Sequence, residues 1–335
     1  MAHFILDGLE KYNSHDYIFL MKFWPILIVF LTFQMDLFGT NSAFGQSTYD
    51  FLNLDVSAHE AALAGSMMAR TDDPTAFYYN PALSVAAKDR SVSFTFLKHV
   101  LDINAGYLFS TFRLPGKGYF GAGISYINYG SFTMTDEMGN SIGSFSAGDV
   151  AVTLNYANYL SDNFSYGFNL KGIYSSIASA RSSAAAFDAG LYYNFPDNLF
   201  GIGFSLLNVG TQLSSYGNEK ESLPFDMRIG VSKQLEHLPL VLNLAFRGLG
   251  DQSLTTSDKI RSFVLGGEFL LSDNFHVLVG YDNLEHQQMK VGISSGIEGL
   301  SFGIRLNLLG YGLDYSYSSW GKMGALHRIN LTTSF

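Results

Sequence analysis

Residues suited to catalysis or metal binding are few and scattered along the chain. Asp72 and Asp73 could contribute to a cation site, but no further oxygen ligands follow at loop spacing, and with Pro74 they favour a turn. The eight His residues occur singly, without a pair at metal-ligand spacing. The absence of Cys excludes disulfides, thiolate metal sites, thiol nucleophiles and a lipid-modified N-terminal Cys. We therefore expect no enzyme activity, no metal and no cofactor.

Six charged residues stand in segments where their immediate neighbours are apolar or Gly. If these segments are strands of a membrane barrel, the six side chains point into the lumen, away from lipid. Opposite charges that pair there would lock a plugged barrel, whereas unpaired charges would tune a channel, and we favour pairing. The six predicted lumenal charges are Lys171, Arg228, Arg247, Glu268, Arg305 and Asp314.

The segments that must position these charges alternate with a period of two. In 164–171 (FSYGFNLK) aromatic and aliphatic residues alternate with Ser, Gly, Asn and Lys, and 240–247 and 302–308 behave in the same way. Only 15% of residues are charged, against about 25% in an average soluble domain. A mean hydropathy of +0.12 is too low for a bundle of membrane helices. An Arg should therefore be tolerated far better at Asn169 than at the outward-facing Phe168.

Such strands suit either a sandwich or a membrane barrel, and the connections favour the barrel. Tight turns alternate along the chain with longer polar connections near 134–148, 209–223 and 248–259. Short turns then lie on one side and long loops on the other, as in outer-membrane barrels, whose short turns are periplasmic. The predicted turns are Pro115–Gly118, Ser161–Asn163, Pro196–Asn198, Glu236–Pro239 and Ser272–Asn274.

We predict an all-β transmembrane antiparallel barrel of about 14 strands over residues 90–335. Fifteen candidate strands can be drawn, and because a single-chain bacterial barrel needs an even number, one candidate within 287–319 must be discarded. The last strand ends on the short-turn side at Phe335, and the outer-membrane assembly machinery reads an aromatic terminus of this kind. Gly-rich strands could mean a kinked wall with a lateral gap, or close packing against a plug.

A targeting signal is expected at the start of the chain. The 11 residues 23–33 (FWPILIVFLTF) carry no charge, follow Lys22 and precede the cleavage-like stretch Ala43–Gly45. They are too few for a spanning helix, which needs about 18–20 residues. We therefore expect residues 1–45 to be a signal peptide, with Met21 as an alternative start of translation.

Residues 46–89 differ from the strands that follow. Ser57–Ala69 (SAHEAALAGSMMA) predicts a short helix with Ser57 at the N-cap and Glu60 three residues later, the signature of a capping box. Asn80 precedes Pro81 and is therefore pushed into extended geometry. We expect this segment to be a plug or hatch, either inside the lumen or at the periplasmic mouth.

Four stretches of the plug segment carry a family resemblance: Phe51–Ala58, Ala61–Gly65, Asp72-Asp73-Pro74 and Tyr79–Leu83 (YNPAL). They resemble the opening of the PorV/PorQ family, FadL-like outer-membrane barrels of the Bacteroidetes type IX secretion system. The start YDFLNL at 49–54 and the modest length are closer to PorQ than to PorV. The sequence departs from the family at His59-Glu60, where Arg and a small residue are expected, and at Ala64, where Gly is expected. These four stretches are the specific matches, and the last of them includes Asn80, Pro81 and Ala82. Weaker matches are Asn208–Gly210, Leu223-Pro224, Arg228–Gly230, Gly267–Phe269, Asp314-Tyr315 and His327–Ile329.

The resemblance implies a non-enzymatic outer-membrane protein that helps hold the surface attachment complex, which anchors secreted proteins. Its expected partners are outer-membrane lipid, other type IX secretion proteins of that complex and the assembly machinery. Nucleic acid is not expected, because the net charge is −9 and phosphate binding needs clustered Lys and Arg. The alternative is a FadL-like transporter that passes hydrophobic small molecules, and the fold alone does not choose between the two.

Overall fold

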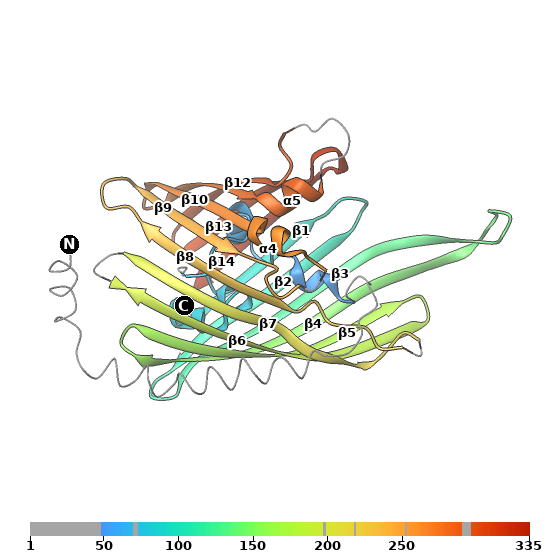
Figure 1. Cartoon of the computed structure of the whole chain (residues 1–335), viewed down its shortest axis with the longest axis horizontal. Helices are drawn as coiled ribbons and strands as arrows, with labels where there is room; N and C mark the ends of the chain where they lie inside the picture. Colours follow the sequence, from blue (N-terminus) through green and yellow to red (C-terminus); the bar gives the residue numbers. More distant parts are fainter. Residues whose placement is uncertain (1–47, 70–72, 197–198, 218, 252, 290–295) are drawn as a thin grey trace. The chain divides into compact units, whose positions relative to one another are not determined.

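The computed structural model describes residues 48–69, 73–196, 199–217, 219–251, 253–289 and 296–335. Its strands close into an antiparallel barrel in which each strand pairs with its sequence neighbours and the last pairs with the first (Figure 1). The predicted signal peptide and the alternative start at Met21 lie outside the described residues. The strands are β1 (Ser91–Lys98), β2 (Asn104–Leu114), β3 (Gly118–Thr135), β4 (Ser141–Ser161), β5 (Phe164–Ile177), β6 (Ala180–Phe195), β7 (Phe200–Ser214), β8 (Asp226–Gln234), β9 (Leu240–Phe246), β10 (Phe263–Ser272), β11 (Phe275–Asp282), β12 (Leu300–Leu308), β13 (Tyr311–Ser319) and β14 (Ala325–Ser334).

The predicted count of 14 strands is confirmed. The surplus candidate was 287–296, whose first residues belong instead to the short helix α5 (Asn283–Gln288), while 290–295 lie outside the described residues. Helix α5 begins because the side chain of Asp282 accepts a hydrogen bond from the backbone N–H of Glu285 at 2.9 Å, which is an N-cap. With an even number of strands, β1 and β14 can close the barrel antiparallel.

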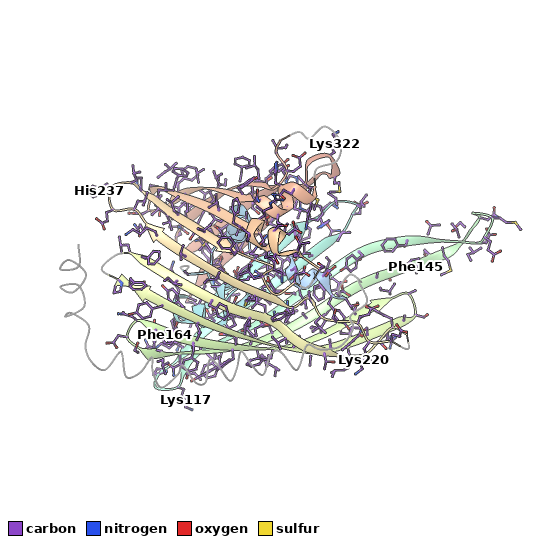
Figure 2. All side chains as sticks on the ribbon, viewed as in Figure 1. Lys117, Phe145, Phe164, Lys220, His237 and Lys322 are labelled. Carbon is purple, nitrogen blue, oxygen red and sulfur yellow. The ribbon has the colours of Figure 1, made fainter. Side chains whose placement is uncertain are left out.

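Short and long connections lie at opposite ends of the barrel. Short turns join β2–β3, β4–β5, β6–β7, β8–β9, β10–β11 and β12–β13 at one end, which we call the turn side. The connections β7–β8, β9–β10 and β11–β12, with the helices α4 (Thr256–Arg261) and α5, lie at the other end, the loop side. In Figure 2, Lys117 and His237 mark the turn side and Lys220 the loop side. In outer-membrane barrels the turn side faces the periplasm.

Two connections differ from the sequence prediction. Residues 134–148 are not a loop, since β3 and β4 stay paired through most of this range and project as a hairpin beyond the neighbouring strands (Figure 1). Asp136 closes the hairpin by accepting hydrogen bonds from the backbone N–H groups of Met138 (2.9 Å) and Asn140 (2.8 Å). On the loop side, β5 and β6 are joined by a tight turn in which Ala178 has a φ of 54°. The polar residues of 134–148 therefore indicated that this segment is exposed to solvent, but they did not indicate that β3 and β4 stay paired there.

Each strand has an outward apolar face and an inward face, as the alternation predicted. On β5, Phe168 and Leu170 are 41% and 59% exposed, whereas Asn169 and Lys171 are each 1% exposed. Outward rings also pack across strands, for example Phe168 against Phe187, with ring centroids 5.5 Å apart. A closed barrel leaves no unpaired strand edge in lipid, so an apolar outer face makes it a membrane-spanning structure.

Replacing Leu170 by Arg should destabilise the barrel by about 2–4 kcal/mol, because an outward Arg near the bilayer midplane must leave water. Leu170 lies in the middle of β5 between Tyr166 and Tyr174, whose amphipathic rings suit the two membrane interfaces. Ser176→Arg, on the same face but at the loop-side end of β5, is the control and should cost at most about 1 kcal/mol. Urea unfolding in phospholipid vesicles measures both, and equal losses would contradict this placement of β5.

The segment before β1 fills the lumen. We call residues 48–90 the plug, of which 70–72 lie outside the described part of the chain. The backbone N–H of Thr48 donates to the carbonyl oxygen of Ser222 on the loop side (3.2 Å), and the plug ends at the turn side, where β1 starts. Within the described residues, no helix is both long and apolar enough to cross a bilayer. The plug contains η1 (Asp50–Asn53), α3 (Ala58–Ala62), η2 (Ala76–Tyr78) and η3 (Pro81–Val85).

Candidate functional site

Glycines on the lumenal face of the wall let the plug lie directly against the strands. A Cβ atom added at Gly203 would lie 1.8 Å from the carbonyl oxygen of Met68, and one at Gly167 would lie 2.2 Å from that of Pro81. No side chain can come so close, so these wall positions require Gly. Of the two roles left open for strand glycines, these contacts match packing against the plug. The wall glycines in such contact are Gly121, Gly167, Gly190, Gly201, Gly203, Gly230, Gly266, Gly280 and Gly303.

The predicted Asn80-Pro81-Ala82 motif fixes the turn-side half of the plug to β6. Asn80 is extended, with φ −144° and ψ 109°, as expected before Pro. Its side-chain amide donates to the carbonyl oxygens of Met68 and of Leu191 on β6, both at 3.1 Å. Its side-chain oxygen accepts from the backbone N–H of Ala82 at 3.1 Å and so caps η3.

Asp73 uses both carboxylate oxygens within the plug. One oxygen accepts from the backbone N–H (2.9 Å) and the hydroxyl (2.7 Å) of Thr75, and the other accepts from the hydroxyl of Ser57 at 3.0 Å. Pro74 follows and is buried, while Asp72 lies outside the described residues. Among the residues that the structure describes, no group of three or more His, Asp and Glu is arranged to hold a metal ion. These bonds fit the turn interpretation of the motif.

The predicted plug helix is shorter than expected, and its capping box is absent. Only α3 is helical, and Ser57 makes no side-chain cap. Glu60 does not reach back to the N-cap; its carboxyl accepts a hydrogen bond from the backbone N–H of Met67 at 3.0 Å. Burial raises the pKa of Glu60 well above its usual value, and the charge of Asp55 adds to this. Tertiary contacts therefore override the local helix signal here.

All six predicted lumenal charges lie inside the barrel; five of them form ion pairs with a residue of opposite charge, and Glu268 contacts His59 and His276. The most enclosed pair joins Lys171 to Asp188, with Nζ 2.8 Å from the carboxylate. Asp188 also accepts from the side chain of Asn169 (2.8 Å) and from the backbone N–H of Asn208 (2.7 Å). The ammonium group of Lys171 also lies 4.7 Å from the ring centre of Tyr78 in the plug. This network connects β5, β6, β7 and the plug.

An ion pair and a His–carboxylate contact connect the wall to the loop-side half of the plug. The guanidinium of Arg247 lies 3.6 Å from Asp55, and the carboxylate of Glu268 lies 3.4 Å from His59. Removing one partner of a buried pair is costly, so these contacts hold the plug in place. The remaining pairs within the wall are Arg228–Asp226, Arg247–Asp282, Glu268–His276 and Arg305–Asp314.

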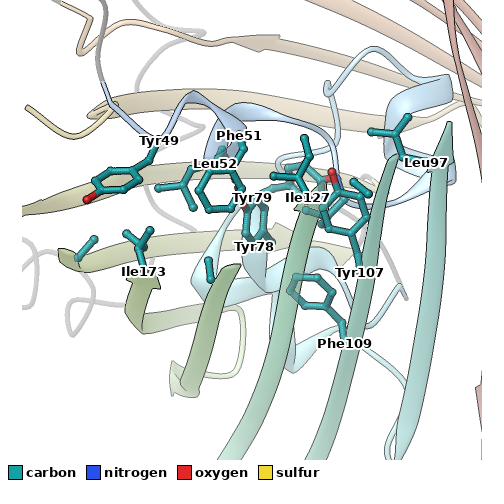
Figure 3. Close-up of a cluster of buried hydrophobic side chains, with 14 of the residues drawn as sticks. Tyr49, Phe51, Leu52, Tyr78, Tyr79, Leu97, Tyr107, Phe109, Ile127 and Ile173 are labelled. Carbon is teal, nitrogen blue, oxygen red and sulfur yellow. Dashed lines mark hydrogen bonds between the residues drawn. The ribbon is translucent and has the colours of Figure 1, made fainter. Parts of the chain in front are cut away.

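The lumen also holds apolar side chains on inward positions where alternation predicted polar ones (Figure 3). Phe109 of β2 is fully buried, with its ring 5.4 Å from that of Phe77 and 5.7 Å from that of Tyr78. Ile103 and Trp320, both in loop-side connections, pack against the same cluster and are partly buried. We call this set the lumenal apolar cluster; its main members are Tyr49, Phe51, Leu52, Phe77, Tyr78 and Tyr79 of the plug and Leu97, Tyr107, Phe109, Ile127 and Ile173 of the wall.

The carboxyl terminus lies on the turn side. Phe335 is 78% exposed, and its backbone N–H donates to the carbonyl oxygen of Arg90 at 3.2 Å, next to the start of β1. The terminal residue thus extends the pairing that closes the barrel. Its role as a signal for the assembly machinery stays a prediction.

The sequence matches no family model and no curated protein. Among solved structures, the toluene transporter TodX of Pseudomonas putida is similar, with a TM-score of 0.55, 12% identity, and coverage of 84% of this chain and 99% of that one. A TodX mutant described as a monoaromatic hydrocarbon channel has a TM-score of 0.53 and 13% identity, with coverage of 83% and 99%. A FadL homologue of Pseudomonas aeruginosa has a TM-score of 0.50 and 10% identity, with coverage of 84% and 98%. The chain is therefore an outer-membrane β-barrel with the fold of the FadL-like proteins.

Proposed function

We propose that this chain is an outer-membrane passage for small hydrophobic molecules. The observation that carries the proposal is the lumenal apolar cluster, which runs from Ile103 and Trp320 on the loop side to Phe77 of the plug and Phe109 of the wall. Porins that conduct polar solutes have polar, water-filled lumens, whereas an apolar lining favours an apolar ligand. Neighbours of the same fold are described as a toluene transporter and a monoaromatic hydrocarbon channel, which supports this substrate class.

Passage requires the plug to change position. A hydrophobic molecule that enters the cluster replaces apolar contacts between the plug and the wall, so it favours a displaced plug by binding to it. Polar contacts between the plug and the wall oppose the displacement, among them Asn80 with Leu191 toward the turn side and Asp55 with Arg247 toward the loop side. The plug then acts as a hatch that a suitable ligand opens.

Uptake of radiolabelled toluene tests the proposal. Cells that lack their own hydrophobic-substrate barrels should take up toluene several-fold faster when they express this chain, while uptake of a sugar of similar mass stays unchanged. Phe109→Gln places an amide in the apolar cluster and should abolish the gain, whereas Phe109→Leu keeps the position apolar and should preserve it. Equal uptake with and without the chain would overturn the proposal.

A second candidate is the attachment role implied by the PorV/PorQ resemblance. The β3–β4 hairpin favours it, because Met134, Met138 and Ile142 are 40%, 89% and 60% exposed on a projection beyond the neighbouring strands. Exposed apolar side chains gathered in one place suit a protein partner. Deletion of the gene in its own host separates the two candidates: loss of surface-anchored proteins with normal toluene uptake supports attachment, and the reverse pattern supports the passage.

A further inference from the structure

A cavity of about 260 Å³ lies on the turn side, between the plug and the β6–β7 hairpin. It is separate from the lumenal apolar cluster, and neither the ion pairs nor the Asn80 motif uses it. Its position places it where a molecule that has passed the plug would emerge. Ala69 lines it from the plug, and Tyr192, Asn194, Pro196, Leu199 and Phe200 line it from the hairpin.

The cavity has the size of a small aromatic ligand. An engineered protein cavity of about 150 Å³ lined by aliphatic and aromatic side chains binds benzene. The larger volume here accommodates one ring with a small substituent. Ring and aliphatic side chains form most of the lining, which matches the composition of small-molecule sites in general.

The lining also selects the charge of the ligand. Among the described residues that line the cavity, none is charged, so an ionised molecule would lose hydration without compensation. The side-chain amide of Asn194 offers a hydrogen-bonding group in a lining of mainly ring and aliphatic side chains. The chemistry fits a neutral phenol or alkylbenzene and opposes a benzoate.

Glycine lets the plug lie directly against the wall at the cavity. A Cβ at Gly201, which also lines it, would lie 2.5 Å from the carbonyl oxygen of Ala69 and 3.1 Å from the ring of Tyr192. The plug is therefore one wall of the cavity, and a ligand there contacts both the plug and the barrel. Displacement of the plug would remove that wall and release the ligand.

We infer that this turn-side cavity is a binding site for one neutral, largely apolar molecule of monoaromatic size, the last site it occupies before it leaves the barrel. The inference rests on the proposed passage function for its direction of transfer, but the binding itself does not. The site involves no part of the lumenal apolar cluster, so the two can be altered independently.

Photolabelling of the full chain in proteoliposomes with 4-azidophenol, followed by peptide mapping, tests the site. Label is expected at Tyr192, Asn194 or Phe200, and excess phenol should compete while benzoate should not. Leu199→Trp fills the cavity from its rim and should reduce the label at least fivefold. Leu309→Trp is the matched control: both residues have a left-handed φ (47° and 54°) in turn-side turns, but Leu309 is 98% exposed. The heat-dependent gel shift of folded barrels verifies folding of each variant.

Asn194→Leu provides a second measurement that does not depend on filling the cavity. It should weaken competition by phenol about fivefold, the effect of one lost hydrogen bond, and leave competition by toluene unchanged. Equal labelling of wild type and Leu199→Trp, or equal competition by phenol and benzoate, would overturn the inference. Normal labelling without toluene uptake would overturn the passage function and leave the site standing. Toluene uptake without labelling of the cavity would overturn the site alone.

Discussion

Asp188→Leu should lower the free energy of unfolding of the barrel by about 3–5 kcal/mol, because it leaves the Lys171 ammonium buried without a counter-charge. Asp188 is fully buried and accepts hydrogen bonds from three donors, which lie on Lys171, Asn169 and the backbone of Asn208. Among the described residues, the Lys171 ammonium would keep the side-chain oxygen of Asn208, at 2.8 Å, and the ring of Tyr78. Urea unfolding in phospholipid vesicles measures the loss.

Two controls isolate the cause. Asp102→Asn breaks the exposed Lys98–Asp102 pair, whose atoms are 3.1 Å apart, and should have little measurable effect because water and salt screen it. The double variant Lys171→Met with Asp188→Leu removes both charges and should recover most of the loss. A double variant less stable than Asp188→Leu alone would mean that the cost comes from packing and not from the unpaired charge.

The wall of the barrel could be predicted from the sequence because lipid imposes a simple rule. Every second residue of a strand must be apolar where it meets lipid, and Leu170 between Asn169 and Lys171 shows that rule directly. The same alternation predicted that the six charged side chains point into the lumen. The rule depends only on the strand itself, so no knowledge of neighbouring strands was needed.

The partners of those charges could not be predicted, because they depend on register between strands. Asp188 lies at a register shift of the β6–β7 pair, opposite a position where Asn208 has a left-handed φ of 59°. A bulge of this kind changes which residues face each other across the strand pair, and no pattern in the sequence predicts it. The period-two alternation along β6 places Asp188 on the same face as Gly190. This signal would have identified Asp188 as an inward residue, but it would not have identified Lys171 as its partner.

The lumen itself was the main obstacle to prediction from sequence. The expectation that Arg would be far milder at Asn169 than at Phe168 rested only on the inward direction of Asn169. Asn169 does face inward, but it is 1% exposed, and its side chain donates to the carbonyl oxygen of Phe77 in the plug at 2.9 Å. Inward apolar residues such as Leu97 and Phe109 fall outside the alternation for the same reason, because they contact the plug and not water. A period of two separates two faces but does not say what covers the inner one.

Gly167→Val should displace the turn-side half of the plug from the wall. The new Cβ would lie 2.2 Å from the carbonyl oxygen of Pro81, 2.4 Å from its carbonyl carbon and 2.7 Å from the backbone nitrogen of Ala82. These are backbone atoms, so no rotation of a side chain relieves the contact. Since ordinary contact begins near 3.4 Å, the plug must shift by about 1 Å or more. Overpacking of this kind costs about 1–3 kcal/mol, which raises the fraction of displaced plug about 5- to 150-fold.

The absence of Cys from the chain makes the displacement measurable. A single Ala82→Cys reporter, fully buried in the plug, should react slowly with maleimide in the otherwise unchanged barrel. With Gly167→Val, the reaction should be about 5- to 150-fold faster. Gly172→Val is the matched control on the same strand, since it faces outward and has nothing within 4 Å of the added Cβ. Planar bilayers should show single-channel currents for Gly167→Val and none for Gly172→Val. Because both changes add the same atoms to β5, equal labelling and equal currents would mean that contact between the wall glycines and the plug does not control access to the lumen.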